Sequence, residues 1–314
     1  MRTFLRILAA LLIVLVLALG AFVALTWAPE RTVAELREQF APPPSVFVEA
    51  AGMQVHLRDE GPRDDPAPIV LLHGTGSSLH AWEGWAAALK PKRRVISFDL
   101  PGYGLTGPSP DRVYGRERDV AFVIAVLDKL GVGRVVLGGN SLGAGVSLRT
   151  ALAHPSRVDA LILVDGGYPA PSTSRPIGLR LLETPGINWV LSNTLPRFLV
   201  EQGMRNVWGD PGKVTPEMID RAVALTQREG NRRALIDRFS QRQPGGPARL
   251  AGIKVPTLII WGGRDRLVPL EAGRALNREI AGSKLVVFEE LGHAPEEEDA
   301  AGTVAAVKTF LGIE

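Results

Sequence analysis

A serine in the middle of the chain stands where a hydroxyl nucleophile could act. The residues Gly139-Asn140-Ser141-Leu142-Gly143 follow an apolar run and open a helix-like run. The pattern G-x-S-x-G between a strand and a helix is typical of a strained turn that presents the serine Oγ at the edge of a sheet. The alternative is an ordinary tight turn capped by a serine. Since a serine hydroxyl needs a base to attack a carbonyl, usually a histidine oriented by a carboxylate, we looked for both partners.

One histidine stands where such a base would be expected. The chain has five histidines, at positions 56, 73, 80, 154 and 293. His293 is the one that follows Ser141 in a loop directly after a predicted strand, which fits the chain order serine, acid, histidine. We therefore predict His293 as the base, with a surface histidine in an acidic loop as the alternative. His73 is expected to brace a loop.

The acid of such a site should follow the strand that precedes the histidine strand. The stretch from Trp261 to Pro269 lies there, and it contains Asp265, our predicted acid. Its alternative is a solvated aspartate paired with a neighbouring arginine. Asp165 is a rival at another strand end, and Asp99 is expected to brace a loop.

Acyl transfer also requires N–H donors for the developing oxyanion. Leu142, directly after the predicted nucleophile, can offer its backbone N–H. We expect the second donor in the loop His73-Gly74-Thr75-Gly76-Ser77-Ser78, and choose the N–H of Thr75. The nucleophile, base and donors would then all come from the chain, so the sequence implies no metal and no organic cofactor.

The elements that must position these residues follow a regular rhythm. Val46–Arg58 is typical of a β-hairpin, and later Val/Ile/Leu runs alternate with helical patterns. This alternation predicts a mostly parallel sheet with helices on both faces. In such sheets reactive groups gather at the carboxyl ends of strands. The rhythm breaks between residues 168 and 247, where about 80 residues predict a small helical subdomain rather than a loop.

The helical insertion carries bulky apolar residues and arginines. Trp189, Phe198 and Trp208 are expected to form its own core, with contact to the substrate as the alternative. The arginines are expected on a solvated face, with contact to anionic lipid as the weaker alternative. They include Arg205, Arg228, Arg232 and Arg233.

Five stretches together resemble the α/β-hydrolase fold superfamily, in the branch with a helical cap. They are HGTGSSLHAW, FDLPGYGLTG, GNSLGAG, WGGRDRLVP and LGHAPEEE, within a resemblance that covers residues 46–313. It implies an eight-stranded sheet with the cap inserted after the sixth strand. It also implies the triad Ser141, Asp265 and His293, with oxyanion donors at Thr75 and Leu142. Thr106 departs from the serine that is common after PGYG, which leaves catalysis untouched.

Within that superfamily the residue types favour a serine hydrolase. Dehalogenases and epoxide hydrolases use an aspartate nucleophile where this chain has Ser141, so neither class is expected. The ring-opening acid of an epoxide hydrolase would also have to be Tyr168, the one tyrosine of the cap, which stands at its edge. We expect a carboxylic-ester hydrolase for small to medium apolar esters. One alternative is a carbon–carbon bond hydrolase of ring-cleavage products, because the stretch GNSLG resembles the serine elbow of those enzymes. Another alternative is a cofactor-free haloperoxidase-like enzyme. The oxyanion loop and the residues after His293 differ from the carbon–carbon hydrolases. A non-catalytic ligand-binding protein is the least favoured.

The N-terminus predicts a membrane anchor. Ile7–Leu25 is an unbroken run of about 19 apolar and small residues, long enough to cross a bilayer as a helix. Arg2 and Arg6 precede it, which predicts a cytoplasmic N-terminus and an extracytoplasmic catalytic domain. We expect an anchor at residues 1–28, a linker at 29–45 and the hydrolase domain at 46–314. A cleaved signal peptide and secretion is the alternative, and a buried helix a weaker one.

The composition of the chain argues against several other classes of function. The formal net charge is +3 and no long Lys/Arg block occurs, so nucleic-acid binding is not expected. The chain has no cysteine, which excludes disulfides, thiol nucleophiles and cysteine-ligated zinc. The expected partners are a small apolar ester or acyl substrate and the membrane, while the sequence leaves the oligomeric state open.

Overall fold

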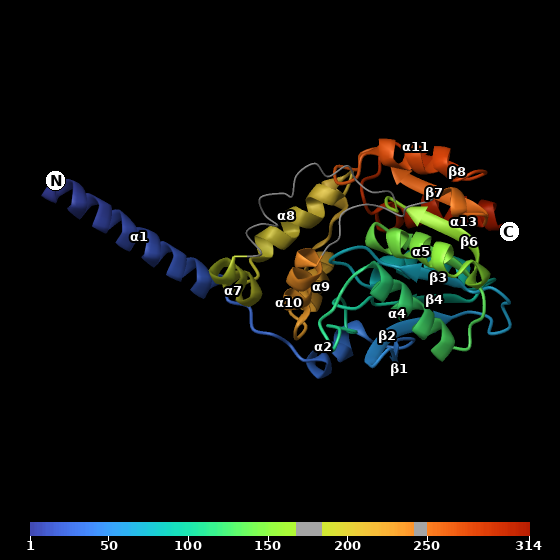
Figure 1. Ribbon diagram of the computed structural model, residues 1–314, viewed down its shortest axis with the longest axis horizontal. Helices are drawn as coiled ribbons and strands as arrows, with labels where there is room; N and C mark the ends of the chain where they lie inside the picture. Colours follow the sequence, from blue (N-terminus) through green and yellow to red (C-terminus); the bar gives the residue numbers. More distant parts are fainter. Residues whose placement is uncertain (168–183, 242–249) are drawn as a thin grey trace.

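The computed structural model describes residues 1–167, 184–241 and 250–314, and its centre is an eight-stranded sheet (Figure 1). The strand order is β1-β2-β4-β3-β5-β6-β7-β8. β1 and β2 form the expected hairpin, β2 pairs antiparallel with β4, and the other pairs are parallel. The strands are β1 (Val46–Ala50), β2 (Met53–Glu60), β3 (Ile69–Leu72), β4 (Val95–Phe98), β5 (Val135–Asn140), β6 (Val158–Val164), β7 (Thr257–Gly262) and β8 (Lys284–Phe288). The expected mostly parallel eight-stranded sheet is confirmed.

Helices cover both faces of this sheet, which explains why its central strands are apolar throughout. In β3, Val70 and Leu72 join one buried cluster, whereas Ile69 and Leu71 join the cluster on the opposite face. The first cluster is closed by α4 (Arg116–Lys129), α5 (Leu142–Ala153) and α11 (Leu270–Glu279). The second is closed by η1 (Leu79–Trp82), α3 (Glu83–Leu89) and α13 (Ala300–Leu311). Successive strand residues point to opposite faces, so a strand covered on both must be apolar at every position.

A helical cap follows the sixth strand, as expected. Between β6 and β7 the chain forms α7 (Pro185–Asn193), α8 (Arg197–Val207), α9 (Pro216–Thr226) and α10 (Asn231–Ser240). Short 3₁₀ turns lie at Pro211–Lys213 and Leu250–Gly252 in the same stretch, and another lies at Pro155–Arg157 before β6. Residues 168–183 and 242–249, which include Tyr168, lie outside the described residues.

The expectation that three bulky cap residues form its core is right for one and wrong for two. Trp208 is 3% exposed and packs with Val214 and Ile219. Trp189 and Phe198 are 56% and 59% exposed, on α7 and α8. The expectation came from the general preference of large apolar residues for burial, whereas these two side chains are more than half exposed. Large exposed apolar side chains that gather on one surface mark contact with a partner or a membrane.

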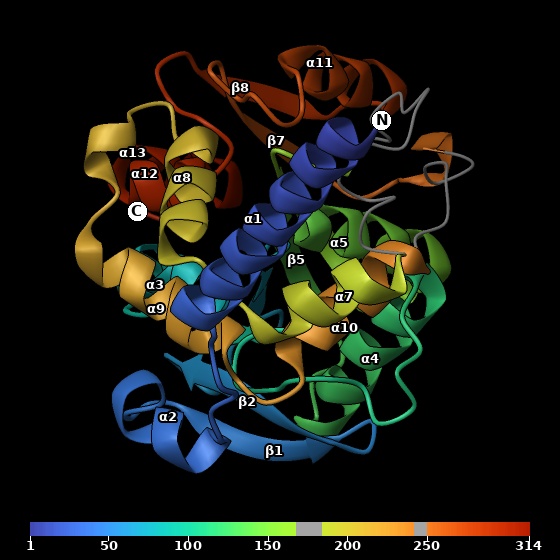
Figure 2. The ribbon, with the colours of Figure 1, turned by 90° about the vertical axis from the view of Figure 1, so that its left-hand side faces the viewer.

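The N-terminal residues form one long helix that extends away from the body of the protein (Figure 1). α1 (Arg2–Thr26) has no buried residue. Among the described residues it is the one helix long and apolar enough to cross a membrane, judged by length and composition alone. Figure 2 shows α1 leaving from the end of the molecule that carries α7, α8 and α10.

The segment between α1 and β1, expected as a linker, contains a short docked helix. α2 (Val33–Phe40) begins with a capping box in which Thr32 and Glu35 satisfy each other's backbone N–H groups. Leu36 and Phe40 are buried against Leu105 and against Leu225 of α9. The segment therefore connects the anchor helix with the sheet and also packs against the cap.

Candidate active site

Ser141 stands at the sharp turn between β5 and α5. Its backbone angles are φ 51° and ψ −107°, a strained region for a residue with a side chain. A Cβ at Gly139 would collide with the backbone of Gly143, and one at Gly143 would collide with the carbonyl of Leu72. Both flanking glycines are thus required by close backbone approach, which favours the elbow interpretation over an ordinary serine-capped turn.

His293 and Asp265 form a hydrogen-bonded pair. The His293 Nδ1 lies 2.7 Å from the Asp265 Oδ2. The other carboxylate oxygen of Asp265 accepts the N–H groups of Leu267 and Val268 at 2.7 and 3.0 Å. Because the Asp265 side chain is fully buried and both oxygens are engaged, its orientation toward the imidazole is fixed.

A further hydrogen bond links this pair to the serine turn. The Asn140 side-chain amide donates to the backbone carbonyl of His293 at 2.8 Å. Asn140 is the last residue of β5 and precedes Ser141, so the loop after β8 is held directly beside the turn. The structure thus brings Ser141, Asp265 and His293 to the carboxyl ends of β5, β7 and β8.

The expected oxyanion donors lie on either side of the serine. A Cβ built on Gly74 would stand 3.4 Å from the Ser141 Cβ, so the loop after β3 passes close to the turn. Thr75 follows Gly74 in this loop, and Leu142 is the first residue of α5. Helix N-termini carry free N–H groups and a partial positive charge, which suits an oxyanion.

Asp165, the alternative candidate for the acid, lies close to Asp265 and His293. A side-chain oxygen of each aspartate and a ring nitrogen of His293 lie within 4.8 Å of one another. Asp165 Oδ1 accepts the N–H of Gly262 at 2.9 Å, and the carboxyl is completely buried. Burial, followed by the negative charge of Asp265, raises the pKa of Asp165 well above its usual value. Its surroundings therefore favour the neutral form of Asp165, and Asp265 makes the contact to the imidazole.

The loop that carries His293 is also tied to the cap. The His293 N–H donates to the carbonyl of Val207, the last residue of α8, at 2.6 Å. The carboxylate of Glu298 accepts the N–H groups of Gly209 and Asp210 from the cap, at 2.9 and 2.7 Å. It also accepts the N–H of Gly292 at 2.9 Å. Sequence reasoning missed this role because the run Glu296–Glu298 resembles a solvated acidic loop.

Glu296, in the same run, is buried without a partner for one of its oxygens. It lies in the short helix α12 (Pro295–Glu298) and is 2% exposed. Its Oε2 has no hydrogen-bond partner among the described residues. Burial, and then the charge of Glu297, raises the pKa of Glu296 well above its usual value. The surroundings of Glu296 therefore favour its neutral form.

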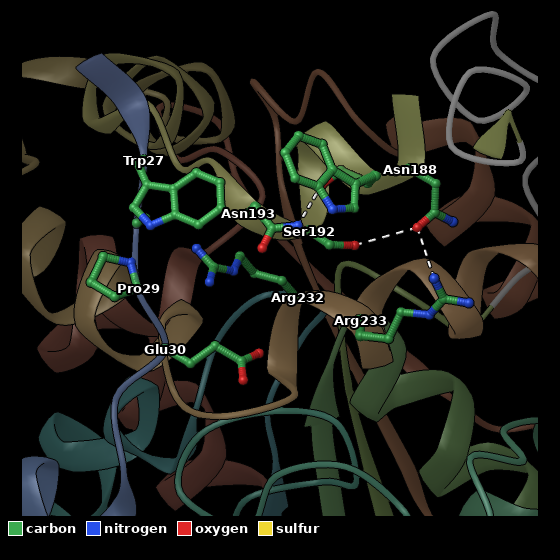
Figure 3. A pocket seen from close by; sticks show the side chains of 10 residues that line it. Trp27, Pro29, Glu30, Asn188, Ser192, Asn193, Arg232 and Arg233 are labelled. Carbon is green, nitrogen blue, oxygen red and sulfur yellow. Dashed lines mark hydrogen bonds between the residues drawn. The ribbon is translucent and has the colours of Figure 1, made fainter. Parts of the chain in front are cut away.

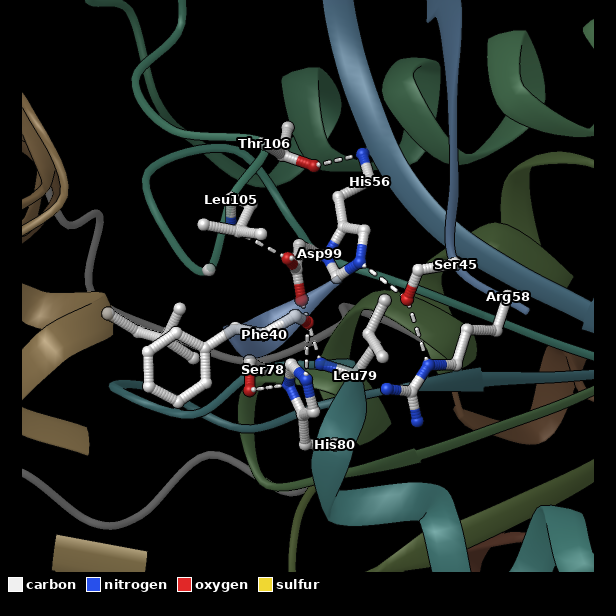
Figure 4. A network of polar contacts seen from close by, with 12 residues as sticks. Phe40, Ser45, His56, Arg58, Ser78, Leu79, His80, Asp99, Leu105 and Thr106 are labelled. Atoms are coloured by element: carbon white, nitrogen blue, oxygen red, sulfur yellow. Dashed lines mark hydrogen bonds and ion pairs between the residues drawn. The ribbon is translucent and has the colours of Figure 1, made fainter. Parts of the chain in front are cut away.

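Asp99 braces a loop, as the sequence indicated (Figure 4), and His73 braces another. The buried Asp99 carboxylate contacts His56 Nδ1 at 2.7 Å and accepts the N–H groups of Leu79 and Leu105, both at 2.8 Å. Burial opposes its ionisation, but the charge and hydrogen bond of His56 outweigh burial and hold the pKa of Asp99 well below its usual value. His73 Nε2 accepts the N–H of Leu100 at 2.9 Å.

Comparison with known proteins agrees with this architecture. Residues 69–307 match the model of the alpha/beta hydrolase family. The chain is 31% identical over 284 residues to a 2-hydroxy-6-oxo-2,4-heptadienoate hydrolase of Pseudomonas putida, covering 85% of this chain and 96% of that protein. A meta-cleavage product hydrolase from Pseudomonas fluorescens has a similar structure, with a TM-score of 0.73, 25% identity, and coverage of 85% and 97% of the two chains.

A third structure is similar over nearly the whole chain, including the N-terminal segment. It is a membrane phospholipase A described as a bacterial virulence factor, with a TM-score of 0.71. The match covers 99% of this chain and 98% of that one at 24% identity, which supports the fold alone. The family match, the sheet with its cap and the serine elbow agree, and the chain belongs to the alpha/beta hydrolase family.

Proposed function

We propose that the protein is a serine hydrolase in which Ser141, His293 and Asp265 form the catalytic triad. The observation that carries this proposal is the 2.7 Å contact between His293 and Asp265, held beside the Ser141 elbow by Asn140. Ser141 Oγ attacks a carbonyl carbon while His293 takes its proton. Asp265 orients the imidazole and stabilises its charged form. The N–H groups of Thr75 and Leu142 receive the negative charge that develops on the carbonyl oxygen.

We propose that the bond cleaved by this enzyme is a carbon–carbon bond in a ring-cleavage product. The carboxylic-ester reading favoured by the sequence ranks second, because the curated relatives at about 30% identity are hydrolases of 2-hydroxy-6-oxo-dienoates. Such a substrate would react as its keto tautomer, in which the proton of the 2-hydroxyl has moved to the carbon next to the 6-ketone. Ser141 attacks this ketone, and the carbon–carbon bond then breaks to leave an ester on Ser141. The leaving fragment carries the bonding electrons as a dienolate and takes a proton from His293. Water then hydrolyses the ester.

Hydrolysis of an apolar ester is the second candidate, and one structural relationship favours it. The cap is joined to the apolar helix α1, since Ala28 N–H donates to Asn193 at 3.0 Å and Leu195 N–H to Thr26 at 2.9 Å. Exposed Trp189 and Phe198 lie on the cap helices beside this junction. A cap held at a membrane would meet esters dissolved in lipid more readily than small, charged ring-cleavage products.

A labelling experiment followed by a substrate panel tests both levels of the proposal. The full chain in detergent is treated with a fluorophosphonate, and the adduct is mapped by mass spectrometry. We expect labelling at Ser141 that disappears in His293→Ala and persists in the control Ser283→Ala. Absence of labelling in a folded protein would contradict the triad. The panel then compares a vinylogous 1,5-diketone with p-nitrophenyl esters of increasing chain length. A higher kcat/KM for the esters would reject the carbon–carbon assignment and leave the triad intact.

We also propose that α1 is a retained membrane anchor with the hydrolase domain on the extracytoplasmic side. Its length and composition support a span, and Arg2 and Arg6 at its start support a cytoplasmic N-terminus. Fractionation of cells expressing the full chain tests this: the protein should stay in membranes after a carbonate wash and be digested by protease added from outside. Recovery of a shortened soluble protein would instead support the cleaved signal.

A further inference from the structure

A cavity lies where the anchor helix enters the cap. The segment Trp27–Glu30 forms one wall, and residues of α7 and α10 form the others (Figure 3). Its volume is about 910 Å³. Two further hydrogen bonds join the anchor end to the cap, besides those to Asn193 and Leu195. The Arg31 N–H donates to the carbonyl of Gln227 at 2.8 Å, and the Arg31 carbonyl accepts the N–H of Glu229 at 2.9 Å. The walls are thus joined by backbone hydrogen bonds, and the cavity is a built part of the fold.

One wall contributes a buried guanidinium, that of Arg232, which forms no ion pair among the described residues. Arg232 is 5% exposed, although the sequence placed it on a solvated face. Its Nε and Nη1 have no hydrogen-bond partner, and the side chain forms no ion pair with any described residue. Burial lowers the pKa of Arg232, and the nearby charge of Glu30 only partly compensates. A buried unpaired charge is costly, and the cost disappears when an anion binds it.

The other charged side chains of the cavity already have partners. Glu30 accepts the N–H of Gly230 at 2.9 Å. Arg233 donates to Asn188 at 2.8 Å and pairs with Asp237 at 3.2 Å. Figure 3 shows the Arg232 guanidinium directed toward the anchor segment, with no dashed line reaching it. Arg232 is therefore the group in this cavity whose burial an anionic ligand would stabilise.

The position of the cavity indicates which anion is available. With α1 in a bilayer, Thr26 marks the end of the span, so the cavity lies at the depth of the lipid headgroups. Trp27 and Trp189 are 49% and 56% exposed, with ring centroids 6.0 Å apart, beside the cavity. Tryptophans concentrate at the membrane–water interface, where headgroup phosphates are the abundant anions.

We propose that this cavity binds the phosphate of a phospholipid headgroup against Arg232, with the acyl chains lying along α1. The proposal rests on the anchor proposed above and is independent of the reaction catalysed. One bound lipid would contact the anchor segment, α7 and α10 together. It would thereby hold the cap in a fixed orientation relative to the membrane surface.

The test uses the full chain, delipidated in a maltoside detergent that has no phosphate. Dihexanoyl-phosphatidylglycerol is titrated below its micelle concentration, and thermal unfolding and native mass spectrometry report binding. Parallel titrations use dihexanoylglycerol, which lacks the phosphate, and inorganic phosphate alone. The variant is Arg232→Gln, and the matched control is Arg274→Gln, an exposed arginine of α11 that pairs with Glu271.

We expect the phospholipid to raise the Tm of the wild type and of Arg274→Gln, with one lipid bound per chain. In Arg232→Gln the lipid affinity should fall by about tenfold or more, the loss expected for a hydrogen bond to a charged group. Without lipid this variant should be at least as stable as the wild type, because an unpaired charge has been removed. Equal stabilisation by dihexanoylglycerol, or unchanged affinity in Arg232→Gln, would overturn the proposal. The same shift with inorganic phosphate alone would overturn the assignment to a lipid.

Discussion

The side-chain amide of Asn140 donates a hydrogen bond to the backbone carbonyl of His293 at 2.8 Å. The two residues are 153 positions apart in the chain, yet each directly adjoins or belongs to the proposed triad. Asn140 itself is 5% exposed, so this contact is made away from solvent. The residue between the first glycine and the serine of the G-x-S-x-G pattern, which the pattern leaves unspecified, therefore positions the histidine loop relative to the nucleophile.

Substitution of Asn140 by aspartate should impair turnover more than binding. The variant keeps the size of the side chain but loses the donor and leaves a buried carbonyl without its partner, at a cost of about 1–3 kcal/mol. A displaced histidine loop should reduce kcat by roughly 10 to 100-fold with a smaller change in KM. Steady-state kinetics on the best substrate of the panel checks this, with Asn277→Asp on α11 as the control. Equal kcat in Asn140→Asp and wild type would contradict the positioning role.

The two aspartates near His293 should respond differently to the same substitution. Asp265→Asn should reduce kcat by about 10⁴-fold, the scale expected when the acid of a serine triad is replaced by an amide. Asp165→Asn should change kcat by less than about threefold, because the surroundings of Asp165 favour an uncharged group and an amide oxygen can still accept from Gly262. Single-turnover measurements of acyl-enzyme formation distinguish the two. A large loss in Asp165→Asn alone would transfer the role of the acid to Asp165.

The strands and the order of the reactive residues could be predicted because they depend on local pattern. Runs such as Ile69–Leu72 are apolar at every position, which a strand covered on both faces requires. The contacts of Asn140 and Glu298 could not be predicted, since each joins segments that only the fold brings together. The burial of Arg232 was missed for a related reason. A helical pattern gives the spacing of charged residues, but the wall that covers Arg232 comes from the anchor segment.

The carboxylate of Glu298 should stabilise both the cap and the histidine loop. It accepts three backbone N–H groups, two from the cap and one from Gly292. Glutamine offers one oxygen and would turn an NH₂ group toward at least one of these donors. We expect Glu298→Gln to lower the free energy of unfolding by about 1–3 kcal/mol and to reduce kcat as well. Urea unfolding and kinetics check this.

The exposed Glu49 of β1 provides the matched control for that experiment. Glu49→Gln makes the same chemical change on the outer strand of the hairpin and should leave stability and kcat unchanged. The stabilising role of the Glu298 carboxylate is rejected if Glu298→Gln unfolds at the same urea concentration as Glu49→Gln.

The buried carboxyl of Glu296 should make the stability of the protein depend on pH. Its folded-state pKa is raised above the ordinary 4.5, mainly by burial. Between pH 4.5 and the raised pKa the unfolded chain releases this proton while the folded chain keeps it, so stability falls as pH rises. Glutamine cannot titrate and removes this slope. Relative to wild type, Glu296→Gln should therefore be more stabilising, or less destabilising, at pH 8 than at pH 5.

The comparison between the two pH values separates titration from packing. Any loss from placing an amide beside the unpartnered Oε2 site is the same at pH 5 and pH 8 and cancels in the difference. Urea unfolding of wild type, Glu296→Gln and the Glu49→Gln control at both pH values supplies the measurement. An identical effect of Glu296→Gln at the two pH values would mean that Glu296 ionises with an ordinary pKa. Its burial would then have to be balanced by a cation or by water.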